Sequence, residues 1–403
     1  MVVIRSFSHN RQFYLLSKSC ILFIILLIFF GLITFDDIQQ KNSNQNDHNP
    51  EIFDSQGAAK RALATPLLFI GGSPRSGTTL LRVLLDSHPS IRCGAETHVL
   101  QNLMILYWRL SLPYEKIRLK LAGIDQNLLY SAMRNFMLEI IQNHQKKFVD
   151  MKTKDILYCN KDPLLMNNAI VIQKLFPKAK FIHIVRDGRA VVNSLIKRQV
   201  IISNFNLSDY GDCLKRWNRM VSSMNYQCSR ISKSCLTIHY EQLILNPKYW
   251  MSVVLKFIGV PWNDSILKHD QLIKSGRIQL SLLERSTEQV IKPINLDALT
   301  SWVKSFPFEM RSKIDSIAPM LKHFGYDPHS YPPDYGRVDE FVLRNMEEMK
   351  QQSMIWAKRE KKVIDGRKDI RKKLNEINQN IHVLNDRFEE EHKSVNEDLI
   401  EYG

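Results

Sequence analysis

The chain has 403 residues, a formal charge of +15 and a hydrophobic fraction of 44%, which is the composition of a globular protein with one large domain or two ordinary ones. The basic balance favours an acidic partner: nucleic acid, anionic lipid, a sulfated sugar, a phosphate cofactor or an acidic peptide. Charge alone does not choose among them. The six cysteines include no CxxC pair, which argues against a zinc site.

The N-terminus carries an apolar run, 20–35, after three basic residues and before two aspartates. It is shorter than the roughly 20 residues of a full membrane span, so a cleaved signal peptide is the alternative. No small-x-small cleavage site closes the run, and short spans suit thin early secretory membranes. We therefore expect a type II protein with a cytoplasmic tail, 1–17, a signal anchor, 18–35, and a lumenal remainder. Glycosylation triplets at Asn206 and Asn263 agree weakly with a lumenal location.

Disulfides are expected if the chain lies in the oxidising lumen. Cys228 and Cys235 are close enough in sequence to close a short loop. A bridge between Cys93 and Cys159 would join distant segments and leave Cys213 free. These are the pairs that we expect, although a sequence alone does not fix disulfide pairing.

The segment 36–64 is polar and rich in Asn and Gln, so a flexible lumenal stem is expected. From 65 to 336, apolar runs alternate with helical patterns, which predicts one α/β catalytic domain with a parallel sheet. Buried strands are expected at 67–70, 180–185 and 235–239. Helical segments are expected after the first strand, where Leu80, Leu81, Leu84 and Leu85 share one face, and at 126–145 and 190–200.

The tail, 337–403, is crowded with charged residues, and its apolar residues recur at spacings of three and four. This spacing is typical of a coiled-coil seam, and the alternative is one amphipathic helix packed on the domain. The seam residues are Val363, Ile370, Leu374, Ile377, Ile381, Leu384 and Phe388.

The sequence GSPRSGTT, Gly72 to Thr79, separates the first predicted strand from a helical pattern. Backbone N–H groups of such a turn, together with the helix N-terminus, cradle a phosphate. The G-x-x-x-x-G spacing of a P-loop is kept, but Thr78 stands where the lysine should be. This argues against an ordinary magnesium nucleotide hydrolase, and Arg75 could clamp an anionic donor instead. A plain glycine turn between packed elements is the alternative.

A second anion site is predicted in IVRDGRAVVNSLIKR, 184–198. Arg186 follows a strand, and Ser194 and Arg198 are four residues apart, so they share one helical face. Ligands of open α/β sheets bind beyond the carboxyl ends of the strands. Surface arginines on an ordinary turn are the alternative. Two anion sites at one edge indicate a nucleotide with a 5′-phosphate group and a separate 3′-phosphate.

Further stretches extend the pattern in order from about 65 to 335: GGSPRSGTTLLRVLLDSHPSIRCGAETHV, EKIRL, CNKDP, VRDGRAVVNSLIKR, HYEQLILNP, PWNDS, ERSTEQVIKPIN and APMLKHFGYDP. With these stretches the chain resembles the tyrosylprotein sulfotransferases. The resemblance implies a P-loop-like sulfotransferase fold, a Golgi membrane location, homodimers and 3′-phosphoadenosine 5′-phosphosulfate as the donor. It further implies protein substrates with a tyrosine near acidic residues, no metal in the chemistry and no nucleic-acid partner.

The resemblance assigns three catalytic residues. Glu96 of GAET matches the family's general base toward the tyrosine hydroxyl, Lys161 of CNKDP a stabiliser of the transition state, and Ser286 of ERST a supporting serine. A carboxylate is a weak base toward a phenol of pKa about 10, but it suffices where proton removal is concerted with transfer. Donor contacts carry over to Arg75, Ser76, Gly77, Thr78, Thr79, Arg186, Ser194, Arg198, Tyr240, Ser286, Thr287, Glu288, Gln289, Val290, Ile291, Lys292, Pro293, Ile294 and Asn295.

The acceptor side departs from the family pattern. Arg118 of EKIRL matches a substrate-contacting arginine, but His98 and Asn102 stand where the family has two further arginines. Histidine is mostly neutral at neutral pH and charged in a mildly acidic compartment, so recognition of acidic acceptors would be weaker, shifted, or carried by other basic groups. Ser301 replaces a donor-side lysine, which should lower the affinity for the donor.

The sequence therefore predicts an enzyme that transfers sulfate to protein tyrosine. A Golgi carbohydrate sulfotransferase would share the donor site but not the acceptor groove. A non-catalytic lumenal scaffold organised by the tail is the alternative from another class, and a P-loop NTPase is the most distant one.

Overall fold

A computed structural model describes residues 63–146 and 156–400. The predicted signal anchor, 18–35, and nearly all of the predicted stem lie outside these ranges. Within the described ranges, no helix combines the length and the apolar character that a membrane span needs. The predicted limits of the catalytic domain, 65–336, stay a prediction.

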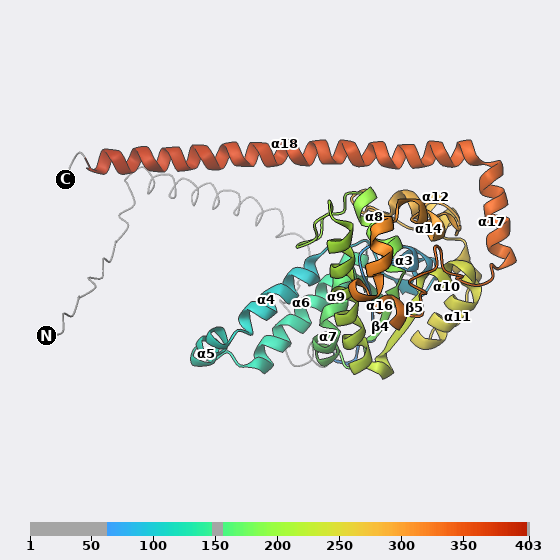
Figure 1. The fold of residues 1–403 in the computed structure, drawn as a ribbon. Helices are drawn as coiled ribbons and strands as arrows, with labels where there is room; N and C mark the ends of the chain where they lie inside the picture. Colours follow the sequence, from blue (N-terminus) through green and yellow to red (C-terminus); the bar gives the residue numbers. More distant parts are fainter. Residues whose placement is uncertain (1–62, 147–155, 401–403) are drawn as a thin grey trace, which may run out of the picture. The chain divides into compact units, whose positions relative to one another are not determined.

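A parallel sheet of five strands forms the centre of the fold, in the order β2-β3-β1-β4-β5 (Figure 1). Every neighbouring pair runs parallel, as the sequence predicted. The three predicted strands are confirmed, whereas the sequence analysis missed the two strands at one edge. The strands are β1 (Leu67–Gly71), β2 (Ile91–Arg92), β3 (Leu157–Lys161), β4 (Lys180–Val185) and β5 (Cys235–His239).

The helices cover both faces of this sheet. The longer ones are α3 (Thr78–Asp86), α4 (Val99–Leu110), α5 (Pro113–Leu121), α6 (Gln126–Lys146), α7 (Ala169–Leu175), α8 (Gly188–Lys197), α9 (Tyr210–Arg230), α10 (Tyr240–Leu245) and α11 (Pro247–Ile258). Short helices follow: α12 (His269–Lys274), α13 (Thr287–Val290), α14 (Asp297–Thr300), α15 (Ile314–Ile317) and α16 (Met320–His323). The 3-10 turns are η1 (Pro163–Asn168), η2 (Ser232–Ser234), η3 (Asp264–Leu267), η4 (Val303–Ser305) and η5 (Phe308–Lys313).

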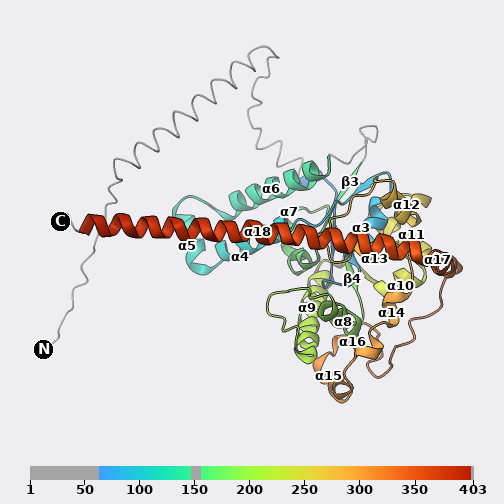
Figure 2. The ribbon, with the colours of Figure 1, turned by 90° about the horizontal axis from the view of Figure 1, so that it is seen from above.

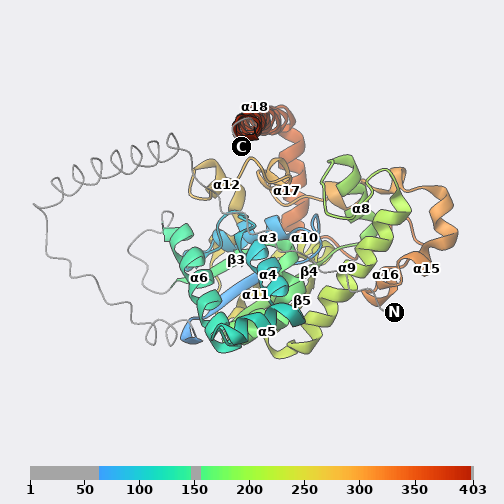
Figure 3. The ribbon, with the colours of Figure 1, turned by 90° about the vertical axis from the view of Figure 1, so that its left-hand side faces the viewer.

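Alternation along β1 divides the core into two layers, because successive side chains of a strand point to opposite faces. Leu68 and Ile70 pack with residues of α3, α10 and α11. Leu67 and Phe69 pack with residues of α4, α6 and α7. A third cluster joins α8 and α9 to the segment 302–326, which carries α15 and α16. Figure 3 shows α8, α9, α15 and α16 together on one side of β4. The sheet is thus buried on both faces, and only its edges and strand ends are open to a ligand.

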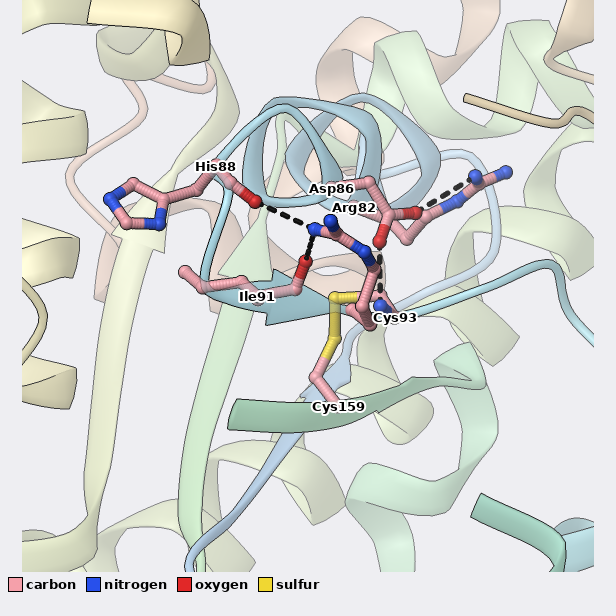
Figure 4. Close-up of a disulfide and its surroundings, with 7 residues drawn as sticks. Arg82, Asp86, His88, Ile91, Cys93 and Cys159 are labelled. Carbon is pink, nitrogen blue, oxygen red and sulfur yellow. Dashed lines mark hydrogen bonds and ion pairs between the residues drawn. A yellow bond between two sulfur atoms is a disulfide. The ribbon is translucent and has the colours of Figure 1, made fainter. Parts of the chain in front are cut away.

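Both predicted disulfides are present. Cys93 and Cys159 bridge the end of β2 to β3 with a Cα–Cα distance of 4.3 Å, and Cys228 and Cys235 close a short loop at 5.4 Å. Cys213 is free and buried, as expected. Figure 4 shows the first bridge below α3. A bridge across 66 residues of sequence removes about 4 kcal/mol of loop-closure entropy from the unfolded chain.

The tail forms two helices, α17 (Glu340–Gln351) and the long α18 (Ser353–Ile400) (Figure 1). The first turns of α18 pack on the domain, because α18 contacts α13 and Trp356 is buried. Figure 2 shows α18 passing over α13. Farther along, Leu374 is 42% exposed and Ile377 is 53% exposed. The start of the tail is thus a helix packed on the domain, which was the alternative interpretation. For the rest of the tail, the coiled-coil seam stays a prediction.

Candidate active site

The glycine loop leads from β1 into α3 and is shaped for an anion. Arg75 and Gly77 both have positive φ angles, 76° and 101°, and such a sequence of conformations turns backbone N–H groups toward one point. Gly77 is required here, since a Cβ atom would lie 2.2 Å from the Tyr240 ring. The Ser76 hydroxyl is buried and has no hydrogen-bond partner within the protein.

A donor cavity of about 270 Å³ opens beside this loop. One face of α8 supplies Asn193, Ser194, Lys197 and Arg198, which are spaced so that they lie on consecutive turns. Other walls come from Arg75 and Gly77 of the loop, Arg186 after β4, Tyr240 after β5, and Ser286, Gln289, Val290, Lys292, Pro293, Ile294 and Asn295. Thr287, Glu288 and Ile291 do not line this cavity, so the structure brings only part of the predicted 286–295 segment to it.

Arg75 holds the centre of the site together. Its guanidinium donates to Ser194 Oγ at 3.0 Å, to Ser286 Oγ and to Gln289 Oε1 at 2.6 Å. Burial, and then the charges of Arg198 and Arg186, lower the pKa of Arg75 to about 9. An excess of buried positive charge of this kind favours a bound anion.

The predicted 3′-phosphate residues are also together. Arg186 donates to Arg75 O at 3.0 Å and Ala298 O at 2.6 Å, and its guanidinium lies 4.5 Å from the centre of the Tyr240 ring. Arg198 forms an ion pair with Glu288. Burial, and then repulsion from Arg367, lowers the pKa of Arg198.

A second, larger cavity of about 570 Å³ lies on the other side of Arg75, and we call it the acceptor cavity. Glu96 and His98 of the loop between β2 and α4, together with Asn102 of α4, form part of its wall. Thr78 and Thr79, predicted as donor residues, face this cavity rather than the donor cavity. Arg75 and Ser286 line both cavities, so the two meet at these side chains.

Of the three predicted catalytic residues, Ser286 lies at this junction, Glu96 lines the acceptor cavity, and Lys161 is buried behind it and lines neither cavity. Lys161, at the end of β3, is buried and forms ion pairs with Glu96 and, at 2.9 Å, with Glu284. Glu284 also accepts from the Glu96 backbone N–H at 2.9 Å. The Cys93–Cys159 bridge ties the start of the loop that carries Glu96 to β3, the strand that carries Lys161.

Glu284 is a site residue that the sequence analysis did not assign, although it lies two positions before Ser286. Burial alone would raise the pKa of this carboxyl, but the Lys161 ammonium and the Arg82 guanidinium lower it to about 2. Arg82 reaches Glu284 at 3.2 Å and Asp86 at 3.2 Å (Figure 4 shows the second pair). Glu284 therefore holds Lys161, the lysine predicted to be catalytic, through its charge.

Asp162 is a second acid that the sequence analysis left out. It is 2% exposed, and both of its carboxylate oxygens lack a hydrogen-bond partner. Burial, and then the neighbouring Glu96, raises its pKa to about 6. His98 Nδ1 lies 3.4 Å from Glu96 Oε1 and 3.9 Å from Asp162 Oδ2. These three groups offer ligand atoms within 4.8 Å of one another, and the expectation that the chemistry needs no metal stays a prediction.

Other predicted residues lie away from the junction. Arg118 is exposed on α5, pairs with Glu115 at 2.6 Å and lines neither cavity, so its role with the acceptor stays a prediction. Asn206 is exposed, whereas Asn263 is half-buried and its side chain accepts from Ser265 N at 3.0 Å. Glycan attachment at either position stays a prediction.

Comparisons with known proteins identify the family. The sequence model described as "Sulfotransferase family" matches residues 66–264. Protein-tyrosine sulfotransferase 1 of Danio rerio is 49% identical over 283 residues, which are 70% of this chain and 78% of that protein. Protein-tyrosine sulfotransferase A of Caenorhabditis elegans is 42% identical over 310 residues, 76% and 79% of the two chains. Protein-tyrosine sulfotransferase 1 of Homo sapiens is 48% identical over 284 residues, 70% and 75% of the two chains. The chain belongs to the protein-tyrosine sulfotransferase family.

Proposed function

We propose that this enzyme transfers the sulfuryl group of 3′-phosphoadenosine 5′-phosphosulfate to the hydroxyl of tyrosine residues in proteins. The observation that carries this proposal is the junction of two cavities at Arg75 and Ser286, with Glu96 on the acceptor side. One cavity is small and rich in arginine, as a doubly phosphorylated nucleotide requires. The other is twice as large and has a mixed lining, as a peptide segment requires.

The residues of the donor cavity fit this nucleotide. Backbone N–H groups of the glycine loop and Arg75 are suited to the 5′ side. The unpartnered Ser76 hydroxyl belongs to the same loop but is buried and lines neither cavity. Arg186, Ser194 and Arg198 are suited to the 3′-phosphate. The family's donor lysine is absent at Ser301, but both Ser301 and Lys197 line the cavity, so Lys197 supplies a cation nearby.

In the transfer step, the phenolic oxygen forms a bond to sulfur while the bond from sulfur to the 5′-phosphate oxygen breaks. The phenol proton passes to Glu96, and the products are tyrosine sulfate and adenosine 3′,5′-bisphosphate. Lys161, held by Glu284, places a positive charge beside Glu96, and Arg75 and Ser286 lie where the two cavities meet. Preorganised charges of this kind stabilise charge that develops during the reaction.

Acidic acceptor peptides would bind to positive groups other than the two arginines that the family pattern has at positions 98 and 102. Arg285 and Arg75 line the acceptor cavity together with His98. Arg285 donates to Gln199 O at 3.4 Å, which leaves most of its guanidinium donors open. We therefore infer that Arg285 contributes to the recognition of acidic residues beside the tyrosine.

Location and assembly form part of the same proposal. The apolar run at 20–35 and the two disulfides support a type II protein of the Golgi membrane with a lumenal catalytic domain. A homodimer is supported by exposed apolar side chains on α4, α5 and α6, three helices that lie together in Figure 1. They include Ile105, Leu106, Trp108, Ile117, Leu121 and Leu128. Exposed apolar side chains that form a contiguous patch are typical of a protein interface.

The test is an acceptor panel. The full chain, purified in detergent, is incubated with donor carrying labelled sulfate and with three acceptors: a tyrosine peptide with flanking acids, the same peptide with phenylalanine, and an oligosaccharide. We expect label on the tyrosine peptide alone. Label on the oligosaccharide alone would show that the enzyme is a carbohydrate sulfotransferase.

A further inference from the structure

The start of α18 reaches the active site through one buried side chain. Arg367 is 8% exposed. Its Nε donates to Leu282 O at 2.9 Å, and its Nη2 donates to Glu284 O at 2.9 Å and to the Glu288 carboxylate. The neighbouring Gly366 allows a close approach, since a Cβ atom there would lie 3.3 Å from Leu282 Cδ1.

The segment that Arg367 holds, 282–288, contains no strand and only the first two residues of the short helix α13. Its side chains nevertheless fix three cations of the site. Glu284 holds Lys161, Ser286 accepts from Arg75, and Glu288 pairs with Arg198. A displacement of this segment would therefore disturb both the donor cavity and the lysine proposed to be catalytic.

Charge gives Arg367 a second effect. Glu288 is buried, and one carboxylate oxygen faces Arg198 while the other faces Arg367. Without Arg367, Arg198 would be the only cation paired with this buried carboxylate, and a donor phosphate would have to compete with it. A second contact from α18 lies nearby, because Glu360 lines the donor cavity and binds Lys292 at 2.7 Å.

We propose that α18 completes the donor site, with Arg367 as the positioning residue that aligns 282–288 and shares the charge of Glu288. This inference rests on the proposed function, since it takes the bound nucleotide to be the donor or its product. The stretches that resemble the family end at about 335, so the resemblance offers no counterpart of Arg367.

The experiment uses the full chain and three variants: Arg367→Gln, Arg367→Lys, and Lys362→Gln as the control. Lys362 is an exposed cation on the same helix, so its replacement removes the same charge without touching 282–288. Calorimetric titration with adenosine 3′,5′-bisphosphate and steady-state kinetics with donor and acceptor peptide are the readouts. For Arg367→Gln we expect Kd and the donor KM to rise roughly 10-fold, because hydrogen bonds to a charged group are lost.

For Arg367→Gln the acceptor KM should stay within about twofold of the wild-type value. Arg367→Lys should give intermediate values of Kd and donor KM, because a lysine keeps the charge but not the forked set of donors. Lys362→Gln should match the wild type. Arg367→Gln protein that binds nucleotide as tightly as the wild type overturns the proposal. Nucleotide binding by none of the proteins, wild type included, instead overturns the proposed function.

A wild-type measurement covers the case in which Arg367→Gln does not fold. Saturating adenosine 3′,5′-bisphosphate should slow amide hydrogen exchange at 282–288 and at 360–368 as well as in the glycine loop. Slower exchange in the loop with no change at 360–368 would show that α18 is no part of the donor site.

Discussion

The donor and acceptor cavities share Arg75 but are built differently. Just over half of the residues that line the donor cavity sit on helices, with α8 contributing the most, and the arginines there are tied to carboxylates, hydroxyls or carbonyls of the protein. The acceptor cavity is lined mainly by loop residues, with smaller contributions from α3 and α4, and its apolar rim is open, with Ile201 88% exposed. This difference between the two cavities indicates that the donor binds to a preformed site. The acceptor binds to a more open surface whose specificity depends on a few side chains.

The largest effect that would sharpen this comparison is expected from Glu96→Gln. The amide cannot accept the phenol proton, so kcat should fall roughly 1,000-fold. Adenosine 3′,5′-bisphosphate should bind within about threefold of the wild type, because Glu96 does not line the donor cavity. Single-turnover rates and calorimetry measure the two quantities, and a large loss of nucleotide affinity would show that the cavities are not separable.

Asp162→Asn tests the buried acid on the acceptor side through stability. The pKa of Asp162 is raised to about 6, so the native state is stabilised by this group below the unfolded-state pKa of about 3.9 and loses that stabilisation as pH rises through 6. The variant should therefore be more stable than the wild type at pH 7.5, by up to about 3 kcal/mol, with the difference vanishing near pH 4.

Urea unfolding at several pH values measures this difference. Asp369→Asn, an exposed position on α18, is the control and should show no pH-dependent gain. A gain of the same size at pH 4 and pH 7.5 would contradict the assigned role of burial and of Glu96.

A smaller effect is expected from His98→Arg, which introduces beside Glu96 the arginine that the resemblance to the family leads us to expect. An arginine is charged at all relevant pH values, so the KM for a peptide with flanking acids should fall about fivefold at pH 7.5, with less change for a peptide without acids. The two peptides are compared side by side with the donor saturating. An equal change in KM for both peptides would show that residue 98 does not recognise acidic residues beside the tyrosine.

The smallest effect is expected from Ser301→Lys, the matched change on the donor side. The donor cavity already holds Lys197 in addition to its arginines, so a further lysine should tighten adenosine 3′,5′-bisphosphate only about threefold at low salt. In the Lys197→Gln background the gain should be larger. Equal gains in both backgrounds, measured by calorimetry, would mean that Lys197 does not compensate for Ser301.

Local sequence patterns were sufficient to predict much of the fold and part of the donor site of this enzyme. Short apolar runs predicted β1, β4 and β5. The glycine spacing predicted the loop whose conformation depends on Arg75 and Gly77. Those signals are short-range, because a buried strand and a strand-to-helix turn each impose their own residue types within a few positions. The resemblance added Glu96, Lys161 and Ser286, which no local pattern singles out. Strands β2 and β3 were missed, since one is very short and the other is only partly apolar.

Tertiary structure alone decided the contacts between distant segments. Nothing near Glu284 in sequence shows that it would hold Lys161, and the helical spacing of the tail gives no sign that Arg367 would be buried against 282–288. Such roles depend on which side chains the closed fold brings within a few ångströms, and a charge acquires its partner only when both are removed from water together. The sequence determined the sheet, the loop and the family; the packing of loop 282–288 between β3, α3 and α18 decided how the cations of the site are held.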